Sequence, residues 1–371
     1  MGKPLVLVGG GHAHMVILAN LGKIVAKGHT ITVIGPSDYH YYSGMGPGML
    51  SGTYQPEEIR FATRHVVEKQ GGSFLQGKAA SIDPQKKTVM LESGDTVPYD
   101  VLCCNAGSNI PKLAIDGERD DIFSVKPIER LMEARNRLVD HFNRQRLNVV
   151  IVGGGPSAAE VAGNVWQLAE TTGGYKPRIT ICTGSAFMSR FPPSVRRKIL
   201  RTLNRRGITI REGVYAKSVS ASAVTLDNGE TLPAAFIFLA LGVKPSPIFA
   251  DSGIASGPDG GLRVNRFLQS IEYPDIFGGG DCIYFEDHPL DKVGVYAVRQ
   301  NPVLLHNVLA QLNGGDLMPF DPGGDDYLLI FNLGGGAGVL KKNWLEFGGR
   351  PAFLVKDYID RKFIKEFQSI E

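Results

Sequence analysis

The sequence predicts an α/β protein with two similar units, because the chain runs twice through one order of elements. In each unit an apolar strand leads into a glycine-rich turn and a helix. A small antiparallel meander, a second apolar strand and a small-residue turn follow. The first series covers residues 5–107 and the second covers residues 148–242. This repeat favours two three-layer, Rossmann-like domains that each bind a dinucleotide.

The first glycine turn joins an apolar strand, residues 5–8, to a helix expected over residues 14–21. Its spacing fits the dinucleotide fingerprint, although His14 stands where the third glycine is usual. Glycines in such a turn let the backbone approach a pyrophosphate, and the helix N-terminus directs free N–H groups towards it. Glycine turns also serve packing alone, so one match does not specify a nucleotide. The predicted binding residues are Gly9, Gly10, Gly11, His12 and Ala13.

The second glycine turn matches the fingerprint more closely. Residues 148–152 form an apolar strand, Gly153-x-Gly155-x-x-Ala158 is the turn, and a helix is expected over residues 157–168. The residues predicted to bind a second nucleotide are Gly153, Gly155, Pro156 and Ser157.

Neither of the next strands ends in the Asp or Glu that usually binds the adenosine ribose. Gly35 follows the strand at 30–34, and Thr183 follows the strand at 178–182. The first ribose must then be held by Ser37, by Asp38 or by backbone alone. At the second turn the sequence does not specify NAD over NADP.

Composition excludes several classes of function. A formal net charge of +3 is too small to indicate a nucleic-acid partner. No apolar run approaches the roughly 20 residues of a membrane span, and the chain opens on a core strand without a basic leader, which favours a cytoplasmic protein. The four cysteines lack CxxC spacing, and no metal site is predicted. Cys103, Cys104 and Cys182 lie in apolar strands and are expected to be inert core residues.

Three further segments each allow two interpretations. Residues 39–48 combine aromatic side chains with glycines and a proline, which predicts a loop that packs on the surface or lines a flat cofactor ring. Eight basic residues from Arg190 to Arg211 indicate a solvated helix face or attraction to a 2′-phosphate or acidic lipid. Asp281, after three glycines, either caps a helix or accepts hydrogen bonds from a polyol.

The segment after Phe320 differs in character from the two units. A strand is expected over residues 327–333, one or two short strands within 344–355, and a helix over 357–370. That helix would carry Ile359, Phe363, Phe367 and Ile370 on one face. Such a stripe is typical of a helix that covers a domain, or of one that contacts a membrane or a second subunit.

The two glycine-turn units and the closing sequence GGGDC at 278–282 resemble the two-dinucleotide-domain flavoproteins of the pyridine nucleotide–disulfide oxidoreductase superfamily. The similarity runs through nearly the whole chain, and it points to the branch of type II NADH dehydrogenases and sulfide:quinone oxidoreductases. Residues 42–45, 294–300 and 356–363 resemble the flavoprotein half that is sometimes fused to selenide, water dikinase.

The resemblance implies FAD on the first unit and NAD(P)H on the second. The FAD-binding domain would comprise residues 1–110 and 263–320, the NAD(P)H-binding domain 111–262, and a C-terminal interface or membrane-facing segment 321–371. Gly242 would lie near the nicotinamide nucleotide. Further residues implied at the FAD site are Ser43 and Pro47 at the flavin ring, Ala106 and Gly107 along the site, and Gly280 and Asp281 near the ribityl chain.

The same resemblance implies two catalytic residues. Glu160 falls where type II dehydrogenases carry a Glu, and would orient the hydride donor or relay protons to the acceptor. Lys292 falls where sulfide:quinone oxidoreductases carry a Lys, and would stabilise negative charge on reduced flavin. Both positions are equally compatible with exposed surface residues.

The sequence departs from both branches at specific positions. Val295 and Arg299 replace glutamines that type II dehydrogenases carry near the quinone, and no cysteine pair stands where sulfide oxidation needs one. Cys282 is a usual small residue of its turn. These departures bear on the acceptor and not on the flavin.

The sequence therefore predicts an FAD-dependent oxidoreductase that passes a hydride from NAD(P)H to flavin and two electrons to a small-molecule acceptor, with quinone one candidate. One alternative is a flavoprotein that oxidises sulfide or another small reductant without NAD(P)H. Another is a non-catalytic flavin-binding redox sensor or partner protein. A homodimer and peripheral contact with the inner face of the membrane are compatible with the C-terminal helix.

Overall fold

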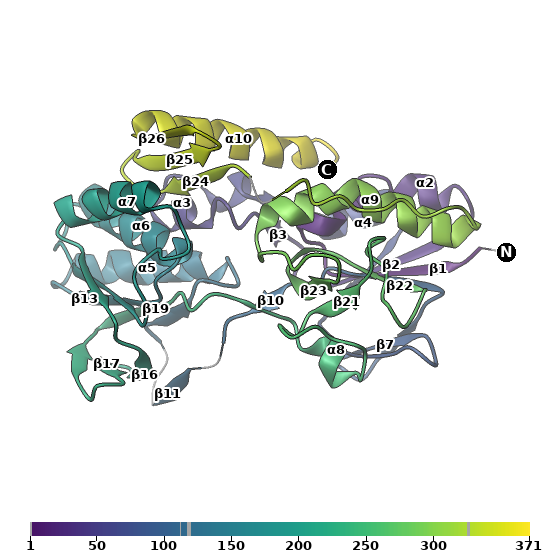
Figure 1. Cartoon of the computed structure of the whole chain (residues 1–371), viewed down its shortest axis with the longest axis horizontal. Coiled ribbons are helices and arrows are strands. Elements are labelled where there is room, and N and C mark those ends of the chain that lie inside the picture. Colours follow the sequence, from purple (N-terminus) through teal and green to yellow (C-terminus); the bar gives the residue numbers. More distant parts are fainter. Residues whose placement is uncertain (1, 112, 117–119, 325–326) are drawn as a thin grey trace.

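The computed structural model describes residues 2–111, 113–116, 120–324 and 327–371. Two α/β units lie side by side, and the C-terminal segment lies across the top of the molecule in Figure 1. Each unit is built on a five-stranded parallel sheet, and small antiparallel sheets accompany them. The predicted fold class is therefore confirmed.

The first unit has the N-terminal strand at the centre of its sheet. Leu5 pairs with Ile31 on one side and Val101 on the other, and all three side chains are buried. Burial on both faces explains why this strand is a continuous apolar run. Across the sheet the strands are β22 (Ile276–Gly278), β9 (Val101–Cys104), β1 (Pro4–Val8), β2 (Thr30–Gly35) and β5 (Ser73–Gln76). The expected meander is β6 (Ala79–Asp83), β7 (Thr88–Leu91) and β8 (Thr96–Pro98).

The single helix expected over residues 14–21 is wrong. A 3-10 turn, η1 (His12–His14), leads into two short helices, α1 (Met15–Leu18) and α2 (Leu21–Val25). The Asn20 side chain donates a 2.8 Å hydrogen bond to the Val16 carbonyl, and side-chain bonds of this kind compete with continued helix. The unit also contains α4 (Thr63–Lys69) and α9 (Gly294–Asn313).

The second unit repeats the order of the first. Its strands, across the sheet, are β12 (Ile122–Ser124), β19 (Phe236–Leu239), β13 (Asn148–Val152), β14 (Arg178–Thr183) and β15 (Thr209–Glu212). Its helices are α5 (Arg130–Phe142), α6 (Pro156–Thr172) and α7 (Pro193–Arg205). Its meander comprises β16 (Ala216–Ser220), β17 (Ala223–Leu226) and β18 (Thr231–Pro233), joined by β11 (Ala114–Asp116). Between the units, β10 (Ser108–Asn109) pairs with β20 (Lys244–Pro245).

The C-terminal segment forms a three-stranded antiparallel sheet and one long helix. The elements are β24 (Leu329–Asn332), β25 (Gly338–Lys342), β26 (Leu345–Gly349) and α10 (Arg350–Gln368). The helix begins seven residues before the expected start at 357, because Gly349 at φ +82° ends the strand and Pro351 occupies the first helical turn. No helix in the described ranges is long and apolar enough to cross a bilayer.

The expected apolar stripe of this helix is divided between two faces. Phe367 is buried and Phe363 packs on the aromatic ring of Tyr42, whereas Ile359 is 38 % exposed. The helix thus covers the molecule with one face and leaves apolar side chains on the other. The apolar side chains on its outer face are Leu354, Val355, Tyr358 and Ile359.

Gly163 of α6 allows the C-terminal segment to approach that helix closely. A Cβ atom at this position would lie 2.0 Å from the carbonyl oxygen of Leu333. We expect Gly163→Ala to lower the free energy of unfolding by about 1–3 kcal/mol, because the backbone must shift. Thermal and denaturant unfolding measure this effect. Gly294→Ala, where an added Cβ meets open space, is the control, and equal stability of the two variants would contradict the packing described.

Candidate functional site

The first glycine turn brings the backbone of β1 against the end of β9. Gly9 has φ +90°, and an added Cβ would lie 2.2 Å from the carbonyl oxygen of Asn105. At Gly11 an added Cβ would lie 2.7 Å from the Asn105 side-chain nitrogen. His14, in the usual third-glycine position, is fully buried, and its Nδ1 lies 2.6 Å from the Gly9 carbonyl oxygen. The imidazole of His14 therefore stabilises the turn from within the core.

Two buried polar atoms at this turn have no partner among the described residues. They are Nε2 of His12 and the side-chain nitrogen of Asn105. Burial lowers the pKa of His12 to about 4, so its ring is neutral at physiological pH. Because unpaired buried polar atoms are costly, these groups fit a site that a polar ligand completes. They stand at the carboxyl ends of the parallel strands, where nucleotides bind in open α/β sheets.

The other residues predicted for the first site lie around the same sheet edge. Ala106 and Gly107 follow β9, and Gly280 and Asp281 follow β22 in the 3-10 turn η3 (Gly280–Cys282). An added Cβ at Gly280 would approach the Asn105 side-chain oxygen to 2.9 Å, so this turn also leaves no space for a larger residue.

Asp281 is held by two groups that the sequence analysis did not identify. Ser108 Oγ donates to its Oδ2 at 2.8 Å, and Lys126 Nζ donates to the same oxygen at 2.9 Å. Burial opposes ionisation of this carboxyl, yet Lys126, Ser108 and His12 together hold its pKa below the ordinary value. No motif marks Lys126, which follows an edge strand of the other unit.

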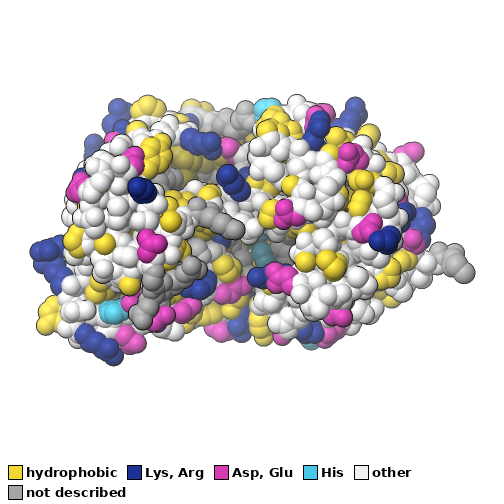
Figure 2. Space-filling model, turned by 90° about the horizontal axis from the view of Figure 1, so that it is seen from below, with side chains coloured by type: hydrophobic (Ala, Val, Ile, Leu, Met, Phe, Trp, Pro, Cys, Tyr) yellow, Lys and Arg dark blue, Asp and Glu magenta, His cyan; other side chains and the backbone are white. Residues whose placement is uncertain are grey.

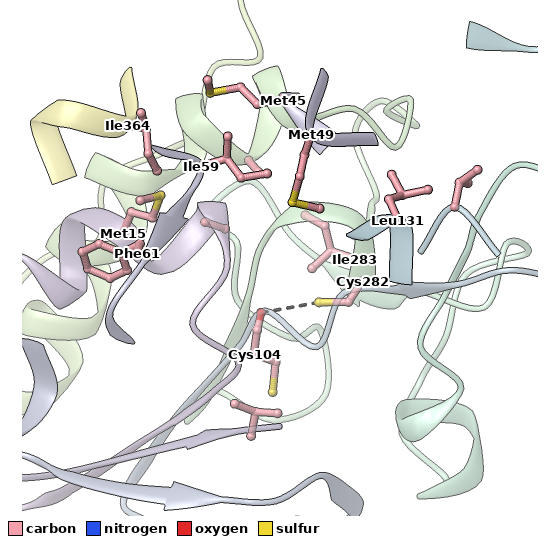
Figure 3. Packing of buried hydrophobic residues seen from close by; sticks show 14 of the residues in the cluster. Met15, Met45, Met49, Ile59, Phe61, Cys104, Leu131, Cys282, Ile283 and Ile364 are labelled. Atoms are coloured by element: carbon pink, nitrogen blue, oxygen red, sulfur yellow. Dashed lines mark hydrogen bonds between the residues drawn. The ribbon is translucent and has the colours of Figure 1, made fainter. Parts of the chain in front are cut away.

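The loop expected over residues 39–48 is wrong in both halves, because His40–Tyr41 form a short strand, β3, and the end of the segment is helical. The short buried helix α3 (Gly46–Leu50) has Pro47 in its first turn and packs against α5 and α6. Gly48 is required because an added Cβ would lie 2.4 Å from the Tyr54 ring. Gly46 and Gly48 therefore allow close packing of the helix and do not provide loop flexibility. Figure 3 shows Met45 and Met49 in the adjoining core.

The side chains considered for ribose binding already have hydrogen-bond partners within the protein. Asp38 is engaged by Arg64 at 2.6 Å, and the Ser37 hydroxyl accepts a hydrogen bond from its own loop. Ser43 precedes α3. In the second unit, Thr183 is buried and its hydroxyl donates to the carbonyl of Ser185.

The second glycine turn has the same close approach as the first. Gly153 has φ +137°, and an added Cβ would lie 2.0 Å from the Ala240 carbonyl oxygen. Gly155 is the N-cap of α6 and faces open space, with Pro156 in the first turn and Ser157 exposed. Gly242, with φ +81°, also has open space around it. The free N–H groups of a 17-residue helix thus point into an open cradle.

Glu160 lies one turn along α6, where it faces the C-terminal segment. Its Oε1 accepts a 2.8 Å hydrogen bond from the backbone N–H of Asn332. Burial raises its pKa to about 7, against opposing contributions from Lys356 and the Asn332 N–H. The carboxyl is therefore able to take up and release a proton near neutral pH.

Two charged residues of α10 accompany Glu160. Lys356 donates to Asp360 Oδ2 at 2.6 Å and to the Gly44 carbonyl at 2.8 Å, and Tyr42 donates to the other carboxylate oxygen at 3.1 Å. Burial also raises the pKa of Asp360. Two carboxyls and one ammonium thus interact electrostatically, which favours retention of one proton. We call Glu160, Lys356 and Asp360 the carboxyl–lysine cluster.

Lys292 is tied to other groups. Its Nζ lies 2.7 Å from Asp259 Oδ2 and donates to the Ile283 carbonyl. It lines a small cavity with Gly280, but its charge is already paired. Its role beside the flavin remains a prediction.

The four cysteines are free and buried. The Cys282 thiol points to the Cys104 carbonyl, as drawn in Figure 3. Burial raises the pKa of all four thiols, so they are protonated and inert. The expectation for Cys103, Cys104 and Cys182 is confirmed.

Two parallel-sheet units, each with a glycine cradle at the start of its first helix, define a protein of the Rossmann class with two nucleotide-binding sites. The family model described as pyridine nucleotide-disulphide oxidoreductase matches residues 3–311. The chain belongs to this family. It is an FAD-dependent enzyme that oxidises NAD(P)H.

Individual relatives agree with this assignment. The type II NADH:quinone oxidoreductase of Staphylococcus saprophyticus is 24 % identical, over 98 % of this chain and 95 % of that protein. The demethylphylloquinone reductase NdbB of Synechocystis is 23 % identical, over 94 % of this chain and 89 % of that protein. The sulfide:quinone oxidoreductase structure of Aquifex aeolicus has a TM-score of 0.79 and 20 % identity, and the match covers 100 % of this chain and 92 % of that chain.

Proposed function

We propose that this enzyme passes the electrons of NAD(P)H through FAD to a quinone at a membrane surface. The observation that carries the proposal is the carboxyl–lysine cluster, in which Glu160 of α6 interacts electrostatically with the Lys356–Asp360 pair of α10. Two curated relatives are named as quinone-reducing enzymes, which supports the same acceptor class.

The first cradle fits FAD through its tight glycine turn and its unpaired polar atoms. Bound there, FAD would accept a hydride and deliver two electrons. Gly9, Gly11 and His12 would hold it at the turn, and Asp281 would accept hydrogen bonds from a polyol. On the other unit, Gly155 leaves the N-terminus of α6 open to a pyrophosphate.

Reduction of a quinone to a quinol consumes two electrons and two protons, whereas NADH oxidation supplies one hydride. The protein must therefore deliver protons at the acceptor side. Because burial raises the pKa of Glu160 to about 7, this carboxyl can take up and release a proton near neutral pH, and it interacts electrostatically with Lys356 and Asp360 of α10. We assign Glu160 the role of proton donor to the acceptor, with its proton replaced from solvent.

The C-terminal segment exposes apolar side chains that suit a bilayer surface. Trp344, at the tip of the β25–β26 hairpin, is 90 % exposed. Tryptophan side chains favour the interface between lipid and water. Three exposed arginines of the neighbouring α7 supply positive charge that complements anionic lipid. They are Arg197, Arg201 and Arg205. We therefore propose that the C-terminal segment faces the membrane.

We expect the double variant Leu354→Ser/Tyr358→Ser to lose most of its binding to vesicles that contain anionic lipid, because it removes apolar area from the outer face of α10. Vesicle co-sedimentation measures this. The control is Met90→Ser on β7, another exposed apolar residue, at the opposite side of the molecule in Figure 1. Equal vesicle binding by the double variant and the control would contradict membrane docking. If the native protein formed a concentration-dependent dimer and the double variant stayed monomeric, the surface would instead bind a second copy of the chain.

The acceptor is tested by steady-state turnover of NADH and NADPH with a soluble quinone, with and without anionic vesicles. We expect quinone-dependent oxidation of at least one nucleotide. Absence of turnover with every quinone, in an enzyme whose FAD is bleached by the nucleotide, would contradict the proposed acceptor.

A further inference from the structure

An ion pair crosses from one unit to the other at the edge of the first nucleotide site. Lys126 belongs to the second unit, between β12 and α5, whereas Asp281 belongs to the closing turn of the first. Their charged atoms are 2.9 Å apart although 155 positions separate them in the sequence. Figure 2 shows the face along which the two units meet, with charged side chains of both signs along the boundary.

Ser108 completes a triangle of polar atoms with this pair. Lys126 Nζ donates to Ser108 Oγ at 3.0 Å, and Ser108 donates to Asp281 at 2.8 Å. Ser108 itself lies in β10, which pairs with β20 between the units. The ammonium is therefore fixed by two partners at the place where the units are joined.

The partial burial of the Lys126–Asp281 pair strengthens the electrostatic effect of the lysine ammonium. The Asp281 side chain is 17 % exposed and that of Lys126 is 32 % exposed, so water screens the pair only in part. Burial, with a smaller contribution from the charge of Lys126, lowers the pKa of His12 to about 4 and that of His40 to about 3. Both imidazoles are neutral at physiological pH. Among the described residues, Lys126 thus provides the positive charge that compensates the Asp281 carboxylate.

Lys292, the cation expected beside the flavin, is placed differently. Its ammonium pairs with Asp259 and not with Asp281. The two lysines therefore form separate ion pairs, and Lys126 is the one bonded to the acid of the closing turn.

We propose that Lys126 is a positioning residue of the flavin site. It neutralises Asp281 and fixes the position of its carboxylate. This ion pair between the two units thereby favours the reduced state of the cofactor. The inference rests on FAD binding by the first unit, and it is independent of the acceptor. Without the ammonium, an uncompensated carboxylate would stand beside a cofactor that gains negative charge on reduction. Reduction would then be less favourable.

The test is the midpoint potential of the bound flavin, titrated with a chemical reductant in the absence of NAD(P)H and quinone. We expect Lys126→Met to lower the potential by about 30 mV or more, which is a tenfold change in a two-electron equilibrium. Lys126→Arg, which keeps the charge, should restore most of the loss. Because neither substrate enters the titration, its result is separate from that of the quinone assay.

The matched control is Lys87→Met, which breaks a Lys–Asp pair with Asp275 at 2.5 Å, away from the closing turn. We expect it to change thermal stability without changing the potential. On an Asp281→Asn background, Lys126→Met should have no further effect, because the lysine acts through that carboxylate. Should Lys126→Met not retain FAD, Ser108→Ala removes one partner of the lysine and gives the same readout at smaller amplitude.

An unchanged potential in Lys126→Met, with the same loss of stability as Lys87→Met, would overturn the proposal and leave a merely structural ion pair. An equal shift in the Asp281→Asn background would also overturn it, since the lysine would then act without Asp281. For Ser108→Ala, an unchanged potential would count in the same way.

Discussion

Replacement of Gly155 by Glu is expected to abolish reduction of the bound flavin by NADH and NADPH while FAD content stays unchanged. Gly155 caps α6, and an added Cβ meets no atom within 4 Å, so a side chain can start from this position without a backbone clash. Its carboxylate would instead stand in the cradle and repel a pyrophosphate at the positive end of the helix. We expect affinity for the nucleotide to fall at least about a hundredfold, or roughly 2.7 kcal/mol.

Anaerobic stopped-flow absorbance measures this effect as the nucleotide concentration that gives half-maximal flavin bleaching. Gly155→Ala is the matched control, because it adds the same Cβ without charge. Bleaching by the Glu variant at the wild-type concentration would show that the second cradle does not bind the nucleotide.

The Glu160→Gln variant is expected to slow quinone reduction by about a hundredfold, the lower range for loss of a general acid. Flavin bleaching by NAD(P)H should change far less, because Glu160 faces the C-terminal segment and not the mouth of the cradle. Rapid mixing separates the two half-reactions. Glu170→Gln, an exposed residue on the same helix, is the control.

The pH dependence of this variant provides a second measurement. Burial raises the pKa of Glu160 to about 7, so in the native enzyme the proton donor is present below pH 7 and lost above it. Quinone reduction should therefore decline as pH rises through 7, and in Glu160→Gln this transition should be absent. Fold stability has the same sign, because a raised carboxyl pKa makes the native state lose stability as pH rises from the unfolded pKa towards 7. A variant with the native rate and pH profile would exclude Glu160 as the donor.

The parts of the fold that depend on local sequence could be predicted. Both glycine turns follow from spacing, because close backbone approach and positive φ at Gly9 and Gly153 exclude other residues. The strands beside them are continuous apolar runs, as burial on both sheet faces requires. Element boundaries that depend on one side-chain contact were missed, as with Asn20 between α1 and α2.

The helix α3 shows why composition alone is ambiguous. Glycine and proline usually interrupt helices, yet here Pro47 occupies the first turn and the glycines admit Tyr54 and Ile128 at close range. Ile128 and the helices α5 and α6, against which α3 packs, come from distant parts of the chain. Local composition therefore predicted a loop.

The charged clusters depend on tertiary contact and carry no local signal. Glu160 meets Asn332 across 172 positions, and Lys126 meets Asp281 across 155. Glu160 was identified through family resemblance, but the Lys356–Asp360 pair that accompanies it was not. Lys126 was missed altogether, because a lysine after an edge strand is ordinary by itself.

Anaerobic mixing of the FAD-loaded enzyme first with NADH or NADPH, and then with a soluble quinone, tests the central claim most directly. The account predicts that a nucleotide bleaches the flavin absorbance and that quinone restores it. Flavin that stays oxidised with both nucleotides but is bleached by sulfide would contradict it.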